Sequence, residues 1–145
     1  MKQAIRSNVA KPECAYVVFS GRSDLPWLRL LKPGFRHCFL AMRQQGCWVL
    51  YEPMSNRTEI SIAAADDGQD IAGWMRQMGF TVLPAVISRE SNRPAPWGPF
   101  TCVEAVKRVL GIHRRGILTP WHLHCFLREQ NMKIVDKDEK LGYIS

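Results

Sequence analysis

The chain has 145 residues and a formal net charge of +7, and 46% of its residues are hydrophobic and 10% aromatic. This length and composition fit one globular domain with its own core, and they exclude a disordered chain. The longest apolar runs are too short to cross a bilayer, and the N-terminus lacks the apolar segment of a signal peptide. We therefore expect a single cytoplasmic domain over residues 1–145, with residues 1–13 as a flexible N-terminal segment.

Cysteine usage and charge distribution narrow the class of protein further. The five cysteines are an odd number and form no Cys-x-x-Cys pair, so a disulfide scaffold is disfavoured and a reducing compartment is expected. Basic residues are spread along the chain, with the densest groups at 107–108 and 113–115. A nucleic-acid-binding protein would concentrate them on one element among aromatic residues. The sequence therefore disfavours nucleic acid as a partner, and a solvated basic surface or an acidic partner remains open.

In chain order, the first half of the sequence predicts strands around one hairpin. Residues 15–19 form an apolar run typical of a buried strand, and residues 26–31 predict a short helical turn. Residues 35–43 and 47–52 then flank a glycine-containing loop, which predicts a β-hairpin. Residues 58–62 predict one further strand beside it.

The register of this hairpin places two polar residues near one another. If the turn is centred near Gln45, His37 at the start of the first arm lies opposite Glu52 or Pro53 at the end of the second. This proximity follows from local pairing alone and requires no assumption about the rest of the fold.

The second half of the sequence predicts helices separated by short strands. A helix is expected from Asp66 and Asp67 to Met78, with Gly79 ending it. Further along, we expect a strand at 80–87, a helix at 99–110, a helix at 121–129 capped by residues 119–120, and a strand at 132–135.

The helix predicted at 99–110 carries a candidate nucleophile in its first turn. Pro99 suits a first helical position, Gly98 or Thr101 is the expected cap, and Gly111 ends the helix. Cys102 then lies in the first turn, where the helix dipole favours the reactive thiolate. The alternative is that Cys102 is a small buried core residue, since free cysteine is among the most buried residue types.

Three residues together supply the parts of a thiol catalyst. A thiol nucleophile needs a base within hydrogen-bond reach, and the base needs a third group to orient it. Cys102, His37 and Glu52 are candidates for these roles, and only the docking of the cysteine helix against the hairpin has to be supposed. Without that docking, His37 is a structural histidine and Glu52 a solvent-facing residue at a strand end.

The order of these segments resembles a known family. Residues 34–39 (GFRHCF), 48–53 (WVLYEP) and 100–107 (FTCVEAVK) are similar to the circularly permuted branch of the papain-like, NlpC-type thiol hydrolases. Residues 116–123 also resemble small bacterial and phage-encoded proteins of this kind. The resemblance covers roughly residues 15–128. It implies an α+β fold in which the nucleophile helix packs on one face of a central antiparallel sheet.

The resemblance also implies roles and a reaction. Cys102 corresponds to the nucleophile, His37 to the base and Glu52 to the orienting polar residue, with no cofactor. Family members hydrolyse peptides, often cell-wall peptides, or transfer acyl groups on lipids. An amide, peptide or related acyl bond is therefore the expected substrate, with the Cys102 backbone N–H and a further donor holding the oxyanion.

Four further residues are candidates for lining the site or for lying beside it. Ser23, Asp24 and Trp27 are candidate lining residues by analogy with the family alone. Cys38 follows His37 on the same strand, and because neighbouring strand residues face opposite sides, we expect Cys38 to point away from the site.

A metal site and a non-catalytic binding module are the alternatives to a thiol catalyst. His122, His124 and Cys125 contain metal-binding groups, but residues two apart on a helix do not face each other, so no metal is expected. The alternative to a thiol hydrolase is a non-catalytic binding or phage-assembly module that keeps this fold and uses its basic surface.

Overall fold

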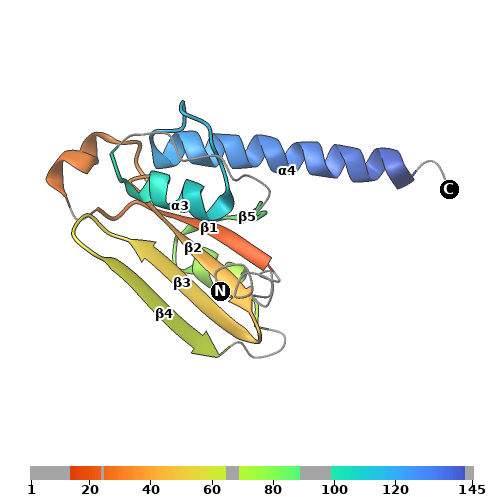
Figure 1. Cartoon of the computed structure of the whole chain (residues 1–145), viewed down its shortest axis with the longest axis horizontal. Coiled ribbons are helices and arrows are strands. Elements are labelled where there is room, and N and C mark those ends of the chain that lie inside the picture. The colour runs from red at the N-terminus through yellow and green to blue at the C-terminus, as the bar shows by residue number, and fades with distance from the viewer. Residues whose placement is uncertain (1–13, 24, 65–68, 89–98, 143–145) are drawn as a thin grey trace, which may run out of the picture.

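The computed structural model describes residues 14–23, 25–64, 69–88 and 99–142, with side chains described as far as residue 135. It is an α+β fold built on a five-stranded antiparallel sheet in the order β4-β3-β2-β1-β5 (Figure 1). The strands are β1 (Cys14–Ser20), β2 (His37–Gln44), β3 (Cys47–Pro53), β4 (Thr58–Ala64) and β5 (Thr81–Ala85). The helices are the 3-10 helix η1 (Pro26–Leu30) and the α-helices α2 (Ile71–Gln77), α3 (Cys102–Leu110) and α4 (Pro120–Gly142).

The predicted hairpin is present as strands β2 and β3. Gln45 and Gly46 form the turn with φ values of 51° and 71°, which is the left-handed pair that a two-residue hairpin turn requires. The pairing closes with Gln44 opposite Cys47, and farther along Leu40 lies opposite Tyr51. This register brings the start of β2 and the end of β3 to the same end of the sheet.

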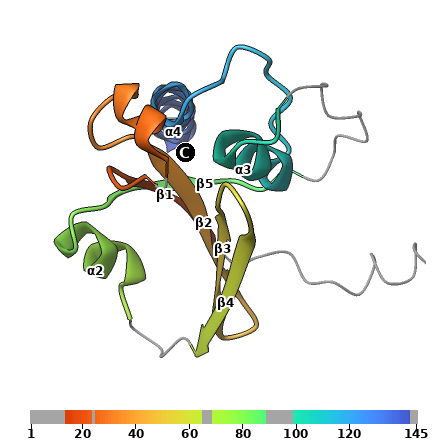
Figure 2. The same cartoon turned by 90° about the vertical axis from the view of Figure 1, so that its left-hand side faces the viewer.

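Helices cover both faces of the central strands. Figure 2 shows α2 on one side of the sheet and α3 with α4 on the other. On β1, Val17 and Phe19 pack against α3 and α4, whereas Val18 packs against α2. Coverage on both faces explains why the sequence of β1 is a continuous apolar run rather than an alternating one.

Helix α3 begins at Cys102, so its predicted start at Pro99 is wrong. Thr101 has an extended backbone, and its hydroxyl accepts a hydrogen bond from the Glu104 backbone N–H at 3.2 Å. Thr101 is therefore the N-cap, one of the two predicted caps. At the other end Gly111 has a φ of 73°, and a Cβ there would collide with the Ser88 carbonyl oxygen. The start of the helix is thus fixed by a local cap, and at its end a glycine both adopts the left-handed conformation and leaves room for the Ser88 backbone.

A buried lysine ties α3 to the loop that follows it. The Lys107 side chain is 3% exposed, and its ammonium group donates to Glu104 Oε2 at 2.9 Å and to the Ile117 carbonyl at 3.5 Å. Arg108 donates to the other oxygen of Glu104 at 3.2 Å. Burial raises the pKa of Glu104, but the hydrogen bonds and charges of Lys107 and Arg108 outweigh it, so the net pKa is lowered. The ion pair within α3 compensates the buried charge of Lys107, and the Lys107 bond to the Ile117 carbonyl ties the helix to the loop.

Helix α2 starts later in the chain than the sequence predicts. Helix α2 begins at Ile71 rather than at the acidic pair, because the Asp70 carboxylate caps it by accepting from the Gly73 N–H at 2.9 Å. Residues 65–68, on which the predicted start fell, and residues 1–13 lie outside the described residues. The single-domain assignment stays a prediction.

The strand predicted at 132–135 is wrong, because helix α4 continues through it to Gly142. No proline or glycine occurs between Pro120 and Gly142, and each further residue adds a helical hydrogen bond. Glu129 and Lys133, four residues apart, also form an ion pair of 2.7 Å on its surface. Among the helices in the described ranges, none is long and apolar enough to cross a membrane.

Candidate active site

The Cys102 side chain lies at the start of α3, against the face of the sheet that α3 covers. It packs on the core cluster that contains Cys38 and Leu40 of β2. The Cys102 sulfur accepts hydrogen bonds from the thiol and the backbone N–H of Cys38 and from the imidazole of His37. The supposed docking of the cysteine helix against the hairpin is therefore present.

These contacts favour the thiolate form of Cys102. They lower its pKa to about 5, with the hydrogen bond from the Cys38 thiol as the largest cause. Burial opposes the shift, and the hydrogen bond and positive charge of His37 add to it. The pKa of Cys38 is raised well above its ordinary value, first by its burial and then by its contact with Cys102. The two thiols thus differ sharply in reactivity.

Glu52 lies beside the imidazole. Glu52 Oε1 is 3.3 Å from His37 Nε2, and the two side chains are 34% and 16% exposed. The imidazole also stacks on the ring of Phe39, with centroids 6.3 Å apart. A carboxylate at this position orients the ring and stabilises its positive charge. The structure therefore brings the three predicted site residues Cys102, His37 and Glu52 together.

The prediction that Cys38 points away from this site is wrong. Side chains alternate along β2, and Cys38 shares the α3 face with Leu40 and with Phe19 of β1. His37 is the first residue of β2, so its side chain reaches Cys102 from the end of the strand. The sequence carried no signal for this face, because the apolar residues 38–41 of β2 are all buried and alternate between the two covered faces.

The loops around η1 include the residues suggested by family analogy. The Ser23 hydroxyl donates to the Leu25 carbonyl at 3.4 Å, and Trp27 on η1 is 61% exposed. Asp24 lies outside the described residues.

Arg36, next to His37, has a positioning role that the sequence reasoning missed. Its backbone N–H donates to the Ser20 carbonyl at 2.9 Å, and its guanidinium donates to the carbonyls of Gly21 at 3.3 Å and Arg29 at 3.5 Å. Arg36 therefore fixes the backbone immediately before His37.

The histidines of α4 have separate environments. His124 is buried, stacked on Trp121 with centroids 5.2 Å apart and 4.7 Å from Phe35. Burial, with Arg128 and Lys32 nearby, lowers its pKa. His122 is exposed. Within the described residues, no group of three or more His, Cys, Asp or Glu side chains is placed to hold a metal ion.

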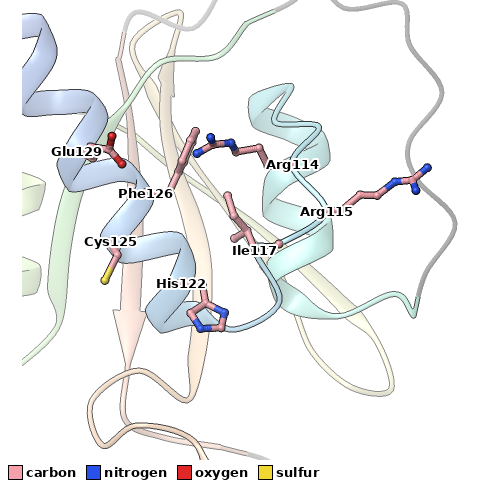
Figure 3. A pocket seen from close by; sticks show the side chains of 8 residues that line it. Arg114, Arg115, Ile117, His122, Cys125, Phe126 and Glu129 are labelled. Carbon is pink, nitrogen blue, oxygen red and sulfur yellow. The ribbon is translucent and has the colours of Figure 1, made fainter.

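A cavity of about 550 Å³ lies between the loop after α3 and helix α4 (Figure 3). Its lining includes the basic residues Arg114 and Arg115, the rings of His122 and Phe126, and one acidic residue, Glu129. The Arg114 guanidinium lies 5.4 Å from the centre of the Phe126 ring, whereas Arg115 extends away from α4. Cys102 does not line this cavity.

Comparisons with protein-family models, with curated proteins and with solved structures found no match to this chain. The assignment of a function therefore rests on the residues and their geometry.

The role of Glu52 leads to a testable expectation. Glu52→Ala should lower the rate of reactions at Cys102 by on the order of tenfold or more, because the imidazole loses the group that orients it. Glu52→Gln should have a milder effect, since an amide oxygen can still accept a hydrogen bond from the ring. The rate and the thermal unfolding midpoint would be measured for each variant.

Glu59 supplies the matched control. It lies directly opposite Glu52 on β4 and pairs with exposed Arg57 at 2.7 Å. Glu59→Ala should leave the rate unchanged. A rate for Glu52→Ala equal to that of Glu59→Ala would remove Glu52 from the site and leave a Cys-His pair.

Proposed function

We propose that the chain is a cysteine hydrolase of the permuted papain-like kind, acting on an amide, peptide or related acyl bond. The observation that carries the proposal is the Cys102 thiolate at the start of a helix, hydrogen-bonded to His37, which Glu52 in turn contacts. Strand order supports it as well, since the histidine hairpin precedes the cysteine helix in the chain as the permuted branch requires. A cell-wall peptide is the expected substrate from the family resemblance.

In the proposed reaction, each step of acyl transfer uses one of these groups. The Cys102 thiolate attacks the carbonyl carbon, and the oxyanion that forms accepts a hydrogen bond from the Cys102 backbone N–H at the first position of α3. The His37 imidazolium gives its proton to the leaving amine or alcohol as the carbonyl bond to that group breaks. Neutral His37 then takes a proton from water, hydroxide attacks the thioester, and the carboxylic acid and the thiolate–imidazolium pair are released.

An activated ester tests the first half of this reaction without knowledge of the natural substrate. p-Nitrophenyl acetate should release p-nitrophenolate in a burst equal to the amount of protein, and peptide mapping should find the acetyl group on Cys102. Cys102→Ser should remove the burst, and Cys47→Ser, at the turn end of the same hairpin, should keep it. Acetylation spread over all five cysteines, or retained after Cys102→Ser, would contradict the proposal.

The basic cavity between the loop after α3 and helix α4 favours the second candidate function, a binding or assembly module with an acidic partner. Arg114, Arg115 and His122 would then be the residues that matter. In that case Arg114→Ala with Arg115→Ala would abolish partner binding, and Cys102→Ser would leave it intact.

A further inference from the structure

Two thiols lie against one another at the start of α3. The Cys38 thiol donates a hydrogen bond to the Cys102 sulfur, and both side chains belong to the same packed cluster. Cys38 is fully buried, Cys102 is partly exposed, and both are free thiols. The hydrolytic reaction uses only Cys102 as the nucleophile. It assigns no role to the Cys38 thiol beside it.

The placement of these thiols suits a disulfide. A disulfide holds its sulfur atoms about 2 Å apart. Because Cys102 already packs against the cluster that contains Cys38, the linkage requires a local movement and no rearrangement of the sheet. Cys102 is the first residue of α3, and Thr101 before it is extended. The small movement would therefore fall at the end of a helix rather than within its hydrogen-bonded interior.

We propose that Cys102 is a site of oxidation by hydroperoxides and that Cys38 resolves the oxidised form into a reversible Cys38–Cys102 disulfide. The linkage removes the nucleophile from the site and protects it from irreversible oxidation. This inference requires a reactive Cys102, but it does not require that the chain hydrolyse an acyl bond.

The chemistry balances with the residues present and one named oxidant. The Cys102 thiolate attacks the outer oxygen of the hydroperoxide, the S–O bond forms as the O–O bond breaks, and the leaving alkoxide takes the His37 proton to become an alcohol or, from hydrogen peroxide, water. Cys38 then attacks the sulfur of this sulfenic acid. The S–O bond breaks, and the departing hydroxide takes the Cys38 proton and leaves as water. The two sulfurs lose two electrons and the hydroperoxide gains them.

The two thiols differ in their access to peroxide because they differ in burial. The exposed part of Cys102 can meet a peroxide molecule, whereas Cys38 has no exposed surface. Cys38 is therefore shielded from direct oxidation and acts on the Cys102 sulfur that it touches. The other three cysteines belong to other regions of the fold: Cys14 packs on the opposite face of the sheet, Cys47 lies at the far end of the hairpin and Cys125 on the surface of α4. A single linkage is therefore expected.

Peptide mapping after peroxide treatment tests the proposal. The full-length protein would be treated with a slight excess of hydrogen peroxide, its remaining thiols alkylated, and the chain digested with trypsin. Cleavage after Arg36 and Arg43 leaves Cys38 as the single cysteine of residues 37–43. We expect this peptide joined to the Cys102 peptide with the loss of two hydrogens, and dithiothreitol should restore full labelling of Cys102.

Variants distinguish a resolving thiol from a bystander. In Cys38→Ala, Cys102 should progress to the sulfinic acid, and dithiothreitol should no longer restore its labelling. Cys38→Val, which keeps more of the buried volume, serves if the alanine variant unfolds, and Cys47→Ala should behave as the unaltered chain. Overoxidation of Cys102 in the unaltered chain without the linkage would overturn the proposal. So would full recovery in folded Cys38 variants that were treated at a pH at which their Cys102 is ionised. Formation of the linkage in a chain that p-nitrophenyl acetate fails to acylate would uphold it and reject the hydrolase.

Discussion

His37→Ala is expected to slow the acylation of Cys102 by p-nitrophenyl acetate by about 10²- to 10⁴-fold, the range that general acid–base groups contribute. The reason is twofold. The variant loses the hydrogen bond and positive charge that His37 places on the Cys102 sulfur, and it also loses the group that carries the proton to and from the leaving group. The initial rate of p-nitrophenolate release would be measured across a range of pH values.

Exposed His122, on α4, provides the control for this substitution. His122→Ala removes an imidazole from the basic cavity and should leave acylation unchanged. Thermal unfolding of both variants would show that the chain remains folded. A folded His37→Ala protein that is acylated as fast as the unaltered chain would contradict the assignment of His37 as the base.

Glu104→Gln is expected to destabilise the fold by about 3 kcal/mol, because removing one partner of a buried ion pair leaves the other charge uncompensated. The uncompensated charge is that of Lys107, whose side chain is 3% exposed. Lys107→Met should cost less, since Glu104 keeps its hydrogen bond with exposed Arg108. Urea unfolding of both variants and of the double variant would separate the pair's interaction from the cost of each change.

Glu129→Gln is the matched control, since the Glu129–Lys133 pair of 2.7 Å is exposed on α4 and should contribute little. The pH dependence adds an independent check. The pKa of Glu104 is lowered in the folded chain, so its contribution to stability is complete above the unfolded pKa of about 4.3 and is lost as the pH falls through the lower, folded value. A Glu104→Gln variant as stable at neutral pH as the Glu129→Gln variant would contradict the account.

The hairpin was predictable because its determinants are local. The turn at Gln45 and Gly46 and the residues of its two arms set the register. With Leu40 opposite Tyr51, this register places Glu52 opposite Phe39, so the predicted direct pairing with His37 is wrong by two residues. The Glu52 carboxylate still reaches the imidazole as a diagonal neighbour across the two strands. The cap of α3 was predictable for the same reason, since Thr101 and Gly111 act on adjacent turns of the helix. Local sequence therefore accounts for two of the three site residues and for the end of the helix that carries the third.

The errors arose where distant segments decide the outcome. The face of the sheet on which α3 packs determines whether Cys38 or its neighbour lies beneath Cys102, and no local pattern encodes that face. At the end of the chain, Ile134 and Val135 favour a strand by local propensity, but the helix that begins at Pro120 extends through them cooperatively. Long-range packing therefore determines that Cys38 lies beside Cys102.

The central claim is that Cys102 is an activated thiol, and the pH dependence of its alkylation tests that claim most directly. The rate of iodoacetamide labelling would be followed at Cys102 and at exposed Cys125 by peptide mapping between about pH 4 and pH 9. We predict a midpoint for Cys102 at about 5, so that at about pH 6 this thiol is mostly ionised while an ordinary thiol is almost wholly protonated. Cys38→Ala and His37→Ala should each move the midpoint upward, because each removes a hydrogen bond to the Cys102 sulfur. A Cys102 midpoint near the ordinary thiol value of about 8.5, unchanged in both variants, would contradict the account.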